Sequence, residues 1–513
     1  MFRFSHQILK AARTWPDAPA VSCDNGTLTW AALTDRCLQL AGVLAEAGVG
    51  HGDRVGFLGF NGHIGIETIF ACPFVGAAVV PLNVRLAVPE LIDMLNDCRP
   101  RVVVVDTAHE DLLAQCLPDC PSVELVLCEG GGRPGWSGYE AALAARDAVP
   151  PEGATVSGGD EMLVMFYTGG TTGRSKGVML SHTNIFANTM GILASWDMPE
   201  GETYAVTGPL FHSAAGARVF ASAFLGAHLV LQAKFDIHGL LAGIERHRIG
   251  VVQFVPTMLA MLLDHPDIGA HDTSSVRMIT YGGAPMPPDL LARTMKAFPG
   301  VRFGQAFGMT EASPIVTFLN PEDYDDLTSP RLNSLGRAAC FVDMMVVDEE
   351  DRPLPPGEIG EFVVRGPNVM SGYWDQPEQT AEAMRGGWYH TGDAGYLDAD
   401  GYGYLSGRIK DMIITGGENV YPIEVEKVLD EHPAVHQVAV IGVPDAKWGE
   451  RVHAVIQYRS ETTADDLIAY CRDRLAHYKC PKTMTLSADP LPLTRVNKID
   501  KVALRARHGG GTE

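Results

Sequence analysis

The sequence has no C-x-x-C pair, although it contains ten cysteines. Cys116, Cys120 and Cys128 come closest to a cluster, but no histidine pattern accompanies them. Structural zinc sites usually combine such cysteine pairs with each other or with regularly spaced histidines. The spacing therefore predicts no metal–thiolate site, and scattered, reduced, mostly buried thiols are typical of a cytoplasmic protein.

Positive charge is also scarce. The chain has 40 Lys and Arg against 62 Asp and Glu, a formal net charge of −22. General nucleic-acid binders and proteins that bind anionic membranes carry basic surfaces, so both classes are disfavoured. An anionic substrate would have to be held by local groups.

Long apolar runs are missing as well. The longest, residues 69–82, is interrupted by Pro73 and is too short to cross a bilayer. Residues 1–20 contain no apolar core of signal-peptide length. We therefore expect no integral membrane segment and a cytoplasmic location.

What is present is a chain of 513 residues, 46% hydrophobic and 20% charged, long enough for more than one domain. Its first part alternates helix and strand signals, which predicts layered α/β sheets. We expect helices over residues 30–47 and 61–72, the second capped by Asn61 and ended by Pro73. We expect strands over residues 54–58, 101–106, 123–127, 162–167, 249–255 and 276–281.

Several later strands run into glycine or small residues followed by polar ones. Examples are Gly282-Gly283-Ala284-Pro285 and Gly308-Met309-Thr310-Glu311. In an open α/β sheet the carboxyl ends of the strands border the ligand site. The sequence thus predicts a ligand site at these strand ends.

The pattern of predicted secondary structure changes near residue 332. Short strands and turns over residues 332–408, among them an alternating, half-exposed strand over residues 360–365, predict a small β-barrel-like subdomain, with a hairpin through residues 398–401. From residue 412 to 513 a new α+β pattern begins, with helices over residues 422–432 and 463–475 and strands between them. About a hundred residues with their own apolar faces can form a separate domain. We expect a large N-terminal domain, residues 1–408, and a small C-terminal domain.

One loop dominates the chain: Tyr167-Thr168-Gly169-Gly170-Thr171-Thr172-Gly173-Arg174-Ser175-Lys176-Gly177, between two apolar runs. Glycines leave backbone N–H groups unobstructed, threonines add hydroxyls and the lysine adds a cation, which together suit a polyphosphate. The loop does not fit G-x-x-x-x-G-K-[ST], so a conventional P-loop NTPase is disfavoured. A plain surface turn is the alternative interpretation.

Taken together, the motifs resemble those of acyl- and aryl-CoA synthetases in the adenylate-forming (AMP-binding) superfamily, over nearly the whole chain. They are the phosphate loop, Gly308-Met309-Thr310-Glu311, Tyr389-His390-Thr391-Gly392-Asp393, Gly407-Arg408-Ile409-Lys410-Asp411, Gly416-Gly417-Glu418-Asn419 and the lysine loop of residues 492–501. The resemblance implies that ATP and CoA are co-substrates and that Mg²⁺ is the metal. A carboxylic acid would be activated as acyl-AMP with release of pyrophosphate, and the acyl group would then pass to CoA.

The resemblance also implies roles for individual residues. The β- and γ-phosphates would be held by Thr168, Gly169, Gly170, Thr171, Thr172, Gly173 and Lys176. The nucleotide and acyl sites would be lined by Gly282, Gly283, Ala284, Pro285, Gln305, Ala306, Phe307, Gly308 and Met309. Thr310 would bind phosphate, Glu311 would hold Mg²⁺, and His212 would lie beside the acyl carboxylate.

Further residues follow the same resemblance. Asp393 would accept hydrogen bonds from both ribose hydroxyls, with Arg408 nearby. Lys498 would reach the substrate carboxylate during the first half-reaction. Lys410 matches the family's hinge, which gives a hinge over residues 409–411 and a mobile lid over residues 412–513. When that lid swings, Lys498 would leave the site and the segment Gly416, Gly417, Glu418 and Asn419 would enter it, with Gly417 letting the pantetheine arm pass close to the backbone.

Three positions depart from the family's usual pattern. Gly169 stands where a serine is usual, Ser175 where a proline is frequent, and Val496-Asn497 where a small residue and glycine commonly precede the lysine. Lys501 lies three residues beyond Lys498.

Three functions are compared. The first is an acid–CoA ligase, for which we favour a medium- or long-chain fatty acid, with an aryl or alicyclic acid as the alternative. The second is a stand-alone adenylating enzyme that loads a carrier protein; His212 replaces the aspartate usual in amino-acid-activating relatives, which disfavours α-amino acids. The third, a non-catalytic binding protein, predicts decay of the phosphate loop, which is not seen. The resemblance is compatible with a homodimer.

Overall fold

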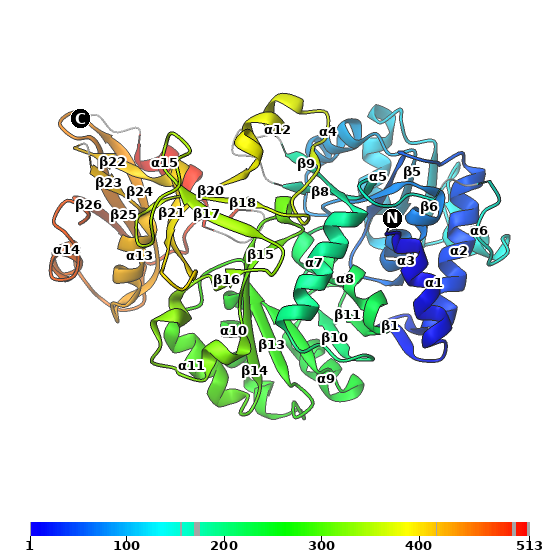
Figure 1. Cartoon of the computed structure of the whole chain (residues 1–513), viewed down its shortest axis with the longest axis horizontal. Coiled ribbons are helices and arrows are strands. Elements are labelled where there is room, and N and C mark those ends of the chain that lie inside the picture. The colour runs from blue at the N-terminus through cyan, green and yellow to red at the C-terminus, as the bar shows by residue number, and fades with distance from the viewer. Residues whose placement is uncertain (1, 154–155, 169–174, 417, 495–498, 510–513) are drawn as a thin grey trace. The chain divides into compact units, whose positions relative to one another are not determined.

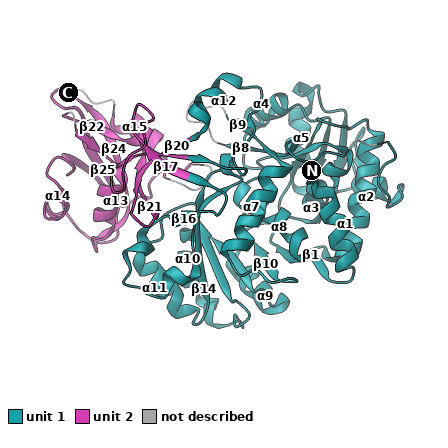
Figure 2. Ribbon diagram, viewed as in Figure 1, with its two compact units in different colours: residues 1–343, 364–389 teal, residues 344–363, 390–513 magenta. Residues whose placement is uncertain are grey.

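A computed structural model describes residues 2–153, 156–168, 175–416, 418–494 and 499–509 (Figure 1). The chain divides into two compact units (Figure 2). Unit 1 comprises residues 1–343 and 364–389, and unit 2 comprises residues 344–363 and 390–513.

Unit 1 contains two large sheets. The first has eight strands in the spatial order β19 (Gly372–Tyr373), β9 (Lys176–Ser181), β8 (Met162–Thr168), β4 (Ala78–Pro81), β3 (Arg54–Leu58), β5 (Val102–Val105), β6 (Leu125–Cys128) and β7 (Ser137–Gly138). Its central strands run parallel, whereas β9 is antiparallel to both β8 and β19. The valines of β5 are fully buried, as expected for a parallel strand covered on both faces.

The second sheet of unit 1 has nine strands. In spatial order they are β16 (Arg337–Ala338), β15 (Ile315–Leu319), β14 (Arg302–Gly308), β13 (Met278–Gly282), β12 (Val251–Phe254), β10 (Thr203–Val206), β11 (His228–Leu231), β1 (Pro19–Cys23) and β2 (Gly26–Thr29). The run from β14 to β1 is parallel, and the strands at both ends are antiparallel.

The helices of unit 1 connect these strands. They are α1 (Phe4–Thr14), α2 (Trp30–Glu46), α3 (His63–Val75), α4 (Val88–Cys98), α5 (Glu110–Cys116), α6 (Tyr139–Ala144), α7 (His182–Ser195), α8 (Ser213–Leu225), α9 (Ile237–His247), α10 (Pro256–Leu263), α11 (Pro288–Ala297) and α12 (Pro377–Ala383). The ring of Phe4 in α1 packs against Phe70 of α3 and Phe220 of α8, at 5.5 and 4.9 Å between centroids. The N-terminal helix thereby joins helices that follow strands of different sheets.

Unit 2 also has two sheets. One contains β17 (Asp343–Val347), β18 (Gly360–Arg365), β20 (Tyr389–Leu397) and β21 (Gly403–Arg408), and is the predicted β-rich region. The other contains β22 (Ile413–Thr415), β23 (Glu418–Val420), β24 (Val435–Asp445), β25 (Gly449–Tyr458) and β26 (Thr483–Ser487). Its helices are α13 (Pro422–Asp430), α14 (Ala464–Arg472) and α15 (Lys501–His508). By internal contacts, the β-rich region thus groups with the C-terminal residues.

The predicted α/β class is confirmed, with strands β3 and β18 at their expected bounds. The prediction for α3 was wrong at both ends. Asn61 does not cap it, because its side chain bonds to Gly208 and Leu210 instead, and the helix begins at His63. Pro73 lies within the last turn, and the helix ends at Val75, with Gly76 as its C-cap at φ of +76°.

None of the helices in the described part of the chain combines the length and apolar character that a bilayer crossing requires. All ten cysteines are free, and eight of them are buried.

Buried histidines predict how stability depends on pH. Burial lowers the pKa of His182, His228 and His453 to about 4, whereas an unfolded histidine titrates near 6.5. Between these values the unfolded chain binds more protons, so stability falls as pH drops from about 6.5 to 4, by up to roughly 3 kcal/mol per group.

The urea midpoint of unfolding, measured at several pH values, checks this expectation. His182 accepts from the Phe4 amide at 3.3 Å and lies 2.9 Å from the Ser157 hydroxyl, so His182→Gln keeps hydrogen-bonding groups at this position without a titrating ring. The variant should lose less stability than the wild type over this pH range. Equal losses in both proteins would show that His182 is not responsible.

Candidate active site

The ends of β13 and β14 bring two of the predicted site segments together. The two strands are parallel neighbours in the sheet (Figure 1). Gly282 pairs with Ala306. A Cβ at Gly282 would collide with the Ala306 carbonyl, and Gly283 has φ of +78°, so a side chain at either position would be strained. Residues 282–285 and 305–308 therefore lie side by side, as predicted for a ligand site at strand ends.

The segment after β14 turns sharply. Residues Thr310–Ala312 form a 3₁₀ turn, and a Cβ at Gly308 would collide with the Pro314 carbonyl. The Thr310 hydroxyl lies 3.0 Å from that of Ser213, the first residue of α8. The predicted phosphate-binding threonine therefore lies next to the start of α8.

Glu311 is held by a residue that sequence reasoning missed. The Tyr373 hydroxyl donates to Glu311 Oε1 at 3.0 Å, and the Met370 amide donates to the Glu311 carbonyl at 2.8 Å. Burial, reinforced by the Glu311 carboxylate, raises the pKa of Tyr373 and keeps it a donor. The Lys176 ammonium lies 4.6 Å from the centroid of the Tyr373 ring. Lys176, Tyr373 and Glu311 thus form one cluster of a cation, a donor and a carboxylate.

The cluster suits Mg²⁺. Glu311 offers carboxylate oxygen to a hard cation, and among the described residues no group of three or more His, Cys, Asp or Glu gathers as an alternative metal cage. Magnesium typically takes one or two carboxylates and completes its shell with water and substrate phosphates. The donor set at Glu311 fits that pattern.

The predicted phosphate loop joins β8 and β9, which pair antiparallel with Thr168 opposite Lys176. The strand–loop–strand prediction is therefore confirmed at its flanks. Some predicted residues lie outside the described ones: Gly169, Gly170, Thr171, Thr172, Gly173, Gly417 and Lys498.

His212 occupies the N-cap position of α8, half-buried, with its ring 4.8 Å from that of Phe211. Asn61 fixes the segment before it, donating to the Gly208 carbonyl at 2.9 Å and accepting from the Leu210 amide at 3.0 Å. Sequence reasoning missed this positioning role, since Asn61 is 147 residues from Gly208.

A second missed residue supports the turn at Glu311. The buried Asn368 amide donates to the carbonyls of Ala312 and Ile315, at 3.0 and 2.8 Å. Gln305 is buried as well and donates to the Ser334 carbonyl at 3.2 Å. These amide side chains hold backbone near the predicted nucleotide residues and leave few ways for it to shift.

In unit 2, Asp393 and Arg408 stand opposite each other on β20 and β21. Arg408 Nε lies 2.6 Å from Asp393 Oδ1; the carboxylate is buried and the guanidinium half exposed. The predicted ribose-binding carboxylate and its arginine are therefore brought together.

Lys410 lies in a short 3₁₀ turn, Ile409–Asp411, and burial lowers its pKa. Arg505 of α15 donates to the neighbouring Asp411 at 2.7 Å. Further on, Gly416 has φ of +63° and donates its amide to the Trp448 carbonyl, while Glu418 and Asn419 are exposed on β23. The hinge at residues 409–411 and the CoA role of residues 416–419 stay predictions.

The AMP-binding enzyme family profile matches residues 8–374, and the AMP-binding enzyme C-terminal domain profile matches residues 424–498. The chain belongs to the AMP-binding enzyme family. This confirms the predicted superfamily.

Relatives align over nearly the whole chain. A feruloyl-CoA synthase from an Amycolatopsis species is 41% identical over 504 residues, 98% of each chain. An indoleacetate–CoA ligase from Aromatoleum aromaticum is 36% identical over 497 residues, 96% of this chain and 95% of the relative. A medium/long-chain-fatty-acid–CoA ligase from Mycobacterium tuberculosis is 35% identical over 522 residues, 99% of this chain and 90% of the relative.

Solved structures agree. ATP-bound MatB from Rhodopseudomonas palustris has a TM-score of 0.88 at 30% identity, with 99% of both chains covered. An o-succinylbenzoate CoA synthetase from Bacillus subtilis, in complex with ATP and magnesium, has a TM-score of 0.84 at 30% identity, covering 96% of this chain and 98% of its own. The predicted class, an AMP-forming acid–thiol ligase, is confirmed. The family uses ATP and CoA as co-substrates and Mg²⁺ as the metal.

Proposed function

We propose that the enzyme activates an aryl acid that carries oxygen on its ring, and transfers the acyl group to CoA. The observation that carries this proposal is Arg218, a buried arginine in α8 that has no counter-charge among the residues that the structure describes. Sequence reasoning favoured a fatty acid, whose apolar chain would leave that cation unpaired. The feruloyl and indoleacetate relatives, named for aryl acids, support the aryl alternative.

Arg218 is only 8% exposed. One of its amino groups, Nη2, donates to the Thr280 hydroxyl at 3.2 Å, whereas Nη1 is buried without a hydrogen-bond partner. Burial lowers its pKa to about 10, so it stays charged at neutral pH. Among the described residues no carboxylate lies within ion-pair distance of it. An isolated buried charge is costly unless something pairs with it.

A second unpartnered donor lies nearby. The indole Nε1 of Trp196 is buried and unpaired, and the Arg218 guanidinium carbon is 5.9 Å from the Trp196 ring. A Cβ at Gly304 would lie 2.7 Å from that same Nε1. Two donors without acceptors in one buried region suit a ligand that supplies an acceptor oxygen.

The strand register relates these donors to the site. Thr280 pairs with Gly304, two residues before the Gly282–Ala306 pair on the same strands. Residues two apart share one face of a sheet and lie roughly 7 Å apart. An acid whose carboxylate lies at the strand ends would therefore present a ring oxygen, at the far end of an aryl body, to Arg218 and Trp196.

The chemistry then follows in two steps. A carboxylate oxygen of the acid attacks the α-phosphorus of ATP and pyrophosphate leaves; the CoA sulfur attacks the acyl carbon and AMP leaves. Both steps bring anions together, so fixed donors and cations must neutralise charge. By resemblance to the family, Lys176, Thr310 and Lys498 would supply them, and Asp393 with Arg408 would bind the ribose. Mg²⁺ at Glu311 would neutralise phosphate charge when bound.

The experiment is a pyrophosphate-release screen with ferulic, cinnamic, indoleacetic and dodecanoic acids. Acyl-CoA products are identified by mass. We expect the highest kcat/KM with ferulic acid. Activity with dodecanoic acid alone would overturn the aryl proposal but keep the ligase class.

Arg218→Met tests the specificity directly. The variant removes the charge but retains an apolar side chain that can fill part of the space. Losing one charged hydrogen bond of 1.5–3 kcal/mol should lower kcat/KM for ferulate by about 10–100-fold. The kcat/KM for cinnamate, which lacks ring oxygen, should stay unchanged. The melting temperature of the variant should equal or exceed that of the wild type, because an unpaired buried charge has been removed. Equal losses for both acids would contradict the assignment.

A further inference from the structure

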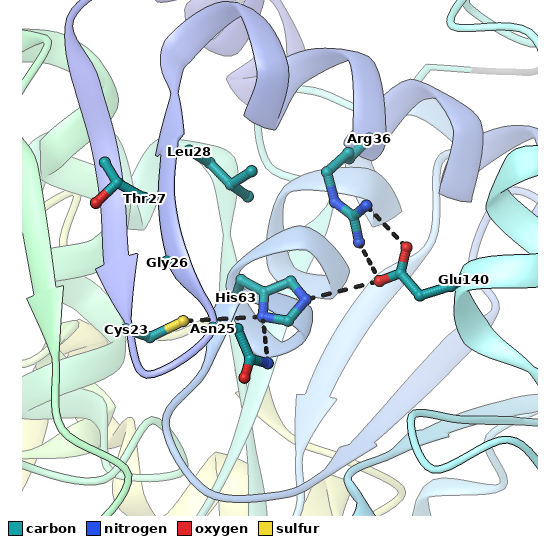
Figure 3. Close-up of a pocket in the computed structure, with 8 residues that line it drawn as sticks. All are labelled: Cys23, Asn25, Gly26, Thr27, Leu28, Arg36, His63 and Glu140. Carbon is teal, nitrogen blue, oxygen red and sulfur yellow. Dashed lines mark hydrogen bonds and ion pairs between the residues drawn. The ribbon is translucent and has the colours of Figure 1, made fainter.

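A thiol, an imidazole and a carboxylate form a short chain in unit 1 (Figure 3). Cys23 ends β1, His63 begins α3 and Glu140 lies in α6. The Cys23 sulfur is 3.8 Å from His63 Nδ1, and His63 Nε2 is 3.8 Å from Glu140 Oε1. All three line a cavity of about 260 Å³, together with Asn25, Gly26, Thr27, Leu28 and Arg36.

Asn25 fixes which ring nitrogen carries the proton. Its amide nitrogen lies 3.4 Å from His63 Nδ1 and 3.1 Å from Glu129 Oε1. An amide NH₂ only donates, so neutral His63 accepts at Nδ1 and carries its proton at Nε2, facing Glu140. When the Cys23 thiol gives its proton to Nδ1, the Asn25 amide loses this acceptor and keeps its bond to Glu129, and Glu140 faces the resulting imidazolium.

The charges around the pair favour that transfer. Arg36 faces His63 from α2, but its guanidinium already contacts Glu67 and Glu140, each at 2.6 Å. Glu67 and Glu140, together with Glu129 that is bonded to Asn25, thus place three carboxylates and one arginine in the surroundings of His63. Burial alone would raise the pKa of Cys23 and lower that of His63; their mutual hydrogen bond and the charges outweigh it and reverse both shifts.

We propose that Cys23 is a covalent modification site, at which low-molecular-weight disulfides exchange with the thiol. His63 Nδ1 takes the thiol proton. The thiolate attacks one sulfur of R–S–S–R, the Cys23–S–S–R bond forms, and the old S–S bond breaks to release R–S⁻, which can take the proton back. No further oxidant is needed, because the disulfide is itself the oxidised partner.

The cavity also selects among disulfides. Arg36 is paired, whereas Glu140 is 60% exposed at the side chain. An anionic disulfide would be repelled by the carboxylates of the cavity, whereas a neutral or cationic disulfide would not be repelled. We therefore expect cystamine and 2-hydroxyethyl disulfide to react faster than 3,3′-dithiodipropionate, most clearly at low ionic strength.

The chain offers an internal control in Cys340. It is exposed, whereas Cys23 is half-buried, and the other eight cysteines are buried. Within the described residues Cys340 has no hydrogen bond to a histidine. Steric access alone would make Cys340 the faster thiol, so a faster Cys23 would have to be activated by its surroundings.

The test treats the full-length protein with 2-hydroxyethyl disulfide and follows each cysteine by peptide mass spectrometry. At pH 7, Cys23 should react about tenfold faster than Cys340, with the ratio shrinking towards pH 9.5, where a thiol no longer needs His63 to lose its proton. His63→Gln should remove the advantage of Cys23 without changing the rate at Cys340. Cys23→Ser should leave ligase activity unchanged.

A Cys23 rate equal to or below that of Cys340 at pH 7 overturns the proposal. So does an unchanged rate in His63→Gln, provided that this variant melts at the wild-type temperature. If the variant does not fold, the wild-type pH profile decides: a ratio that does not change with pH contradicts activation by His63.

Discussion

Replacing Glu311 by glutamine is expected to lower the rate of acyl-adenylate formation by about 10²–10³-fold. Glutamine keeps the size of the side chain and an oxygen that can accept from Tyr373, which donates to Glu311 at 3.0 Å in the wild type. What it removes is the negative charge that a hard cation requires. The rate is measured as pyrophosphate release with saturating acid and ATP.

Magnesium dependence separates this role from a structural one. The Glu311→Gln enzyme should need more Mg²⁺ for half-maximal rate. Tyr373→Phe removes only the hydrogen bond to the carboxylate, so its rate should fall about tenfold or less. A Glu311→Gln enzyme with the wild-type rate and magnesium requirement would show that Glu311 does not hold the metal.

Replacing Lys498 by alanine is expected to slow the first half-reaction, adenylation, and to leave the second, thioester formation, unchanged. By resemblance to the family, Lys498 contacts the substrate carboxylate during the first step only. Its loss should lower adenylation by about 10³-fold. Thioester formation from a supplied acyl-adenylate and CoA should keep its wild-type rate, because the family's lysine leaves the site before that step.

Lys501 provides the matched control. Its ammonium is 2.7 Å from Glu426, an ion pair within unit 2 that gives this lysine a structural partner. Lys501→Ala should therefore leave both half-reactions near wild type. If Lys501→Ala stops adenylation and Lys498→Ala does not, the two lysines have been exchanged in the interpretation of the terminal loop.

Much of the fold could be predicted because its signals are local. The buried valines of β5 and the bounds of β3 and β18 follow from short apolar or alternating runs. The misplaced ends of α3 show where local signals fail. Asparagine is a residue type that often caps helices. The Asn61 side chain instead forms its hydrogen bonds with the distant backbone of Gly208 and Leu210, so it is not available as a cap.

The site could be predicted where it depends on short motifs. The glycines at residues 282, 283 and 308 and the Thr310-Glu311 pair lie at the expected strand ends. Tyr373 and Asn368 could not be found, since they act on residues more than fifty positions away and belong to no motif.

Arg218 did leave a signal in the sequence. It is the one charged residue in α8, which otherwise consists of small and apolar side chains. Only the structure shows that one of its donors is buried without an acceptor. The preference for a fatty acid was based on small residues that suggest a roomy apolar pocket, residues 214–217 and Gly282-Gly283, and did not consider the charge of Arg218.

The most direct test of the whole account omits CoA. The enzyme, mixed with ferulate, ATP and Mg²⁺, should release one equivalent of pyrophosphate and retain feruloyl-AMP, and CoA added afterwards should convert this to feruloyl-CoA and AMP. Release of ADP and phosphate, or no pyrophosphate from any acid in the screen, would contradict activation through an acyl-adenylate.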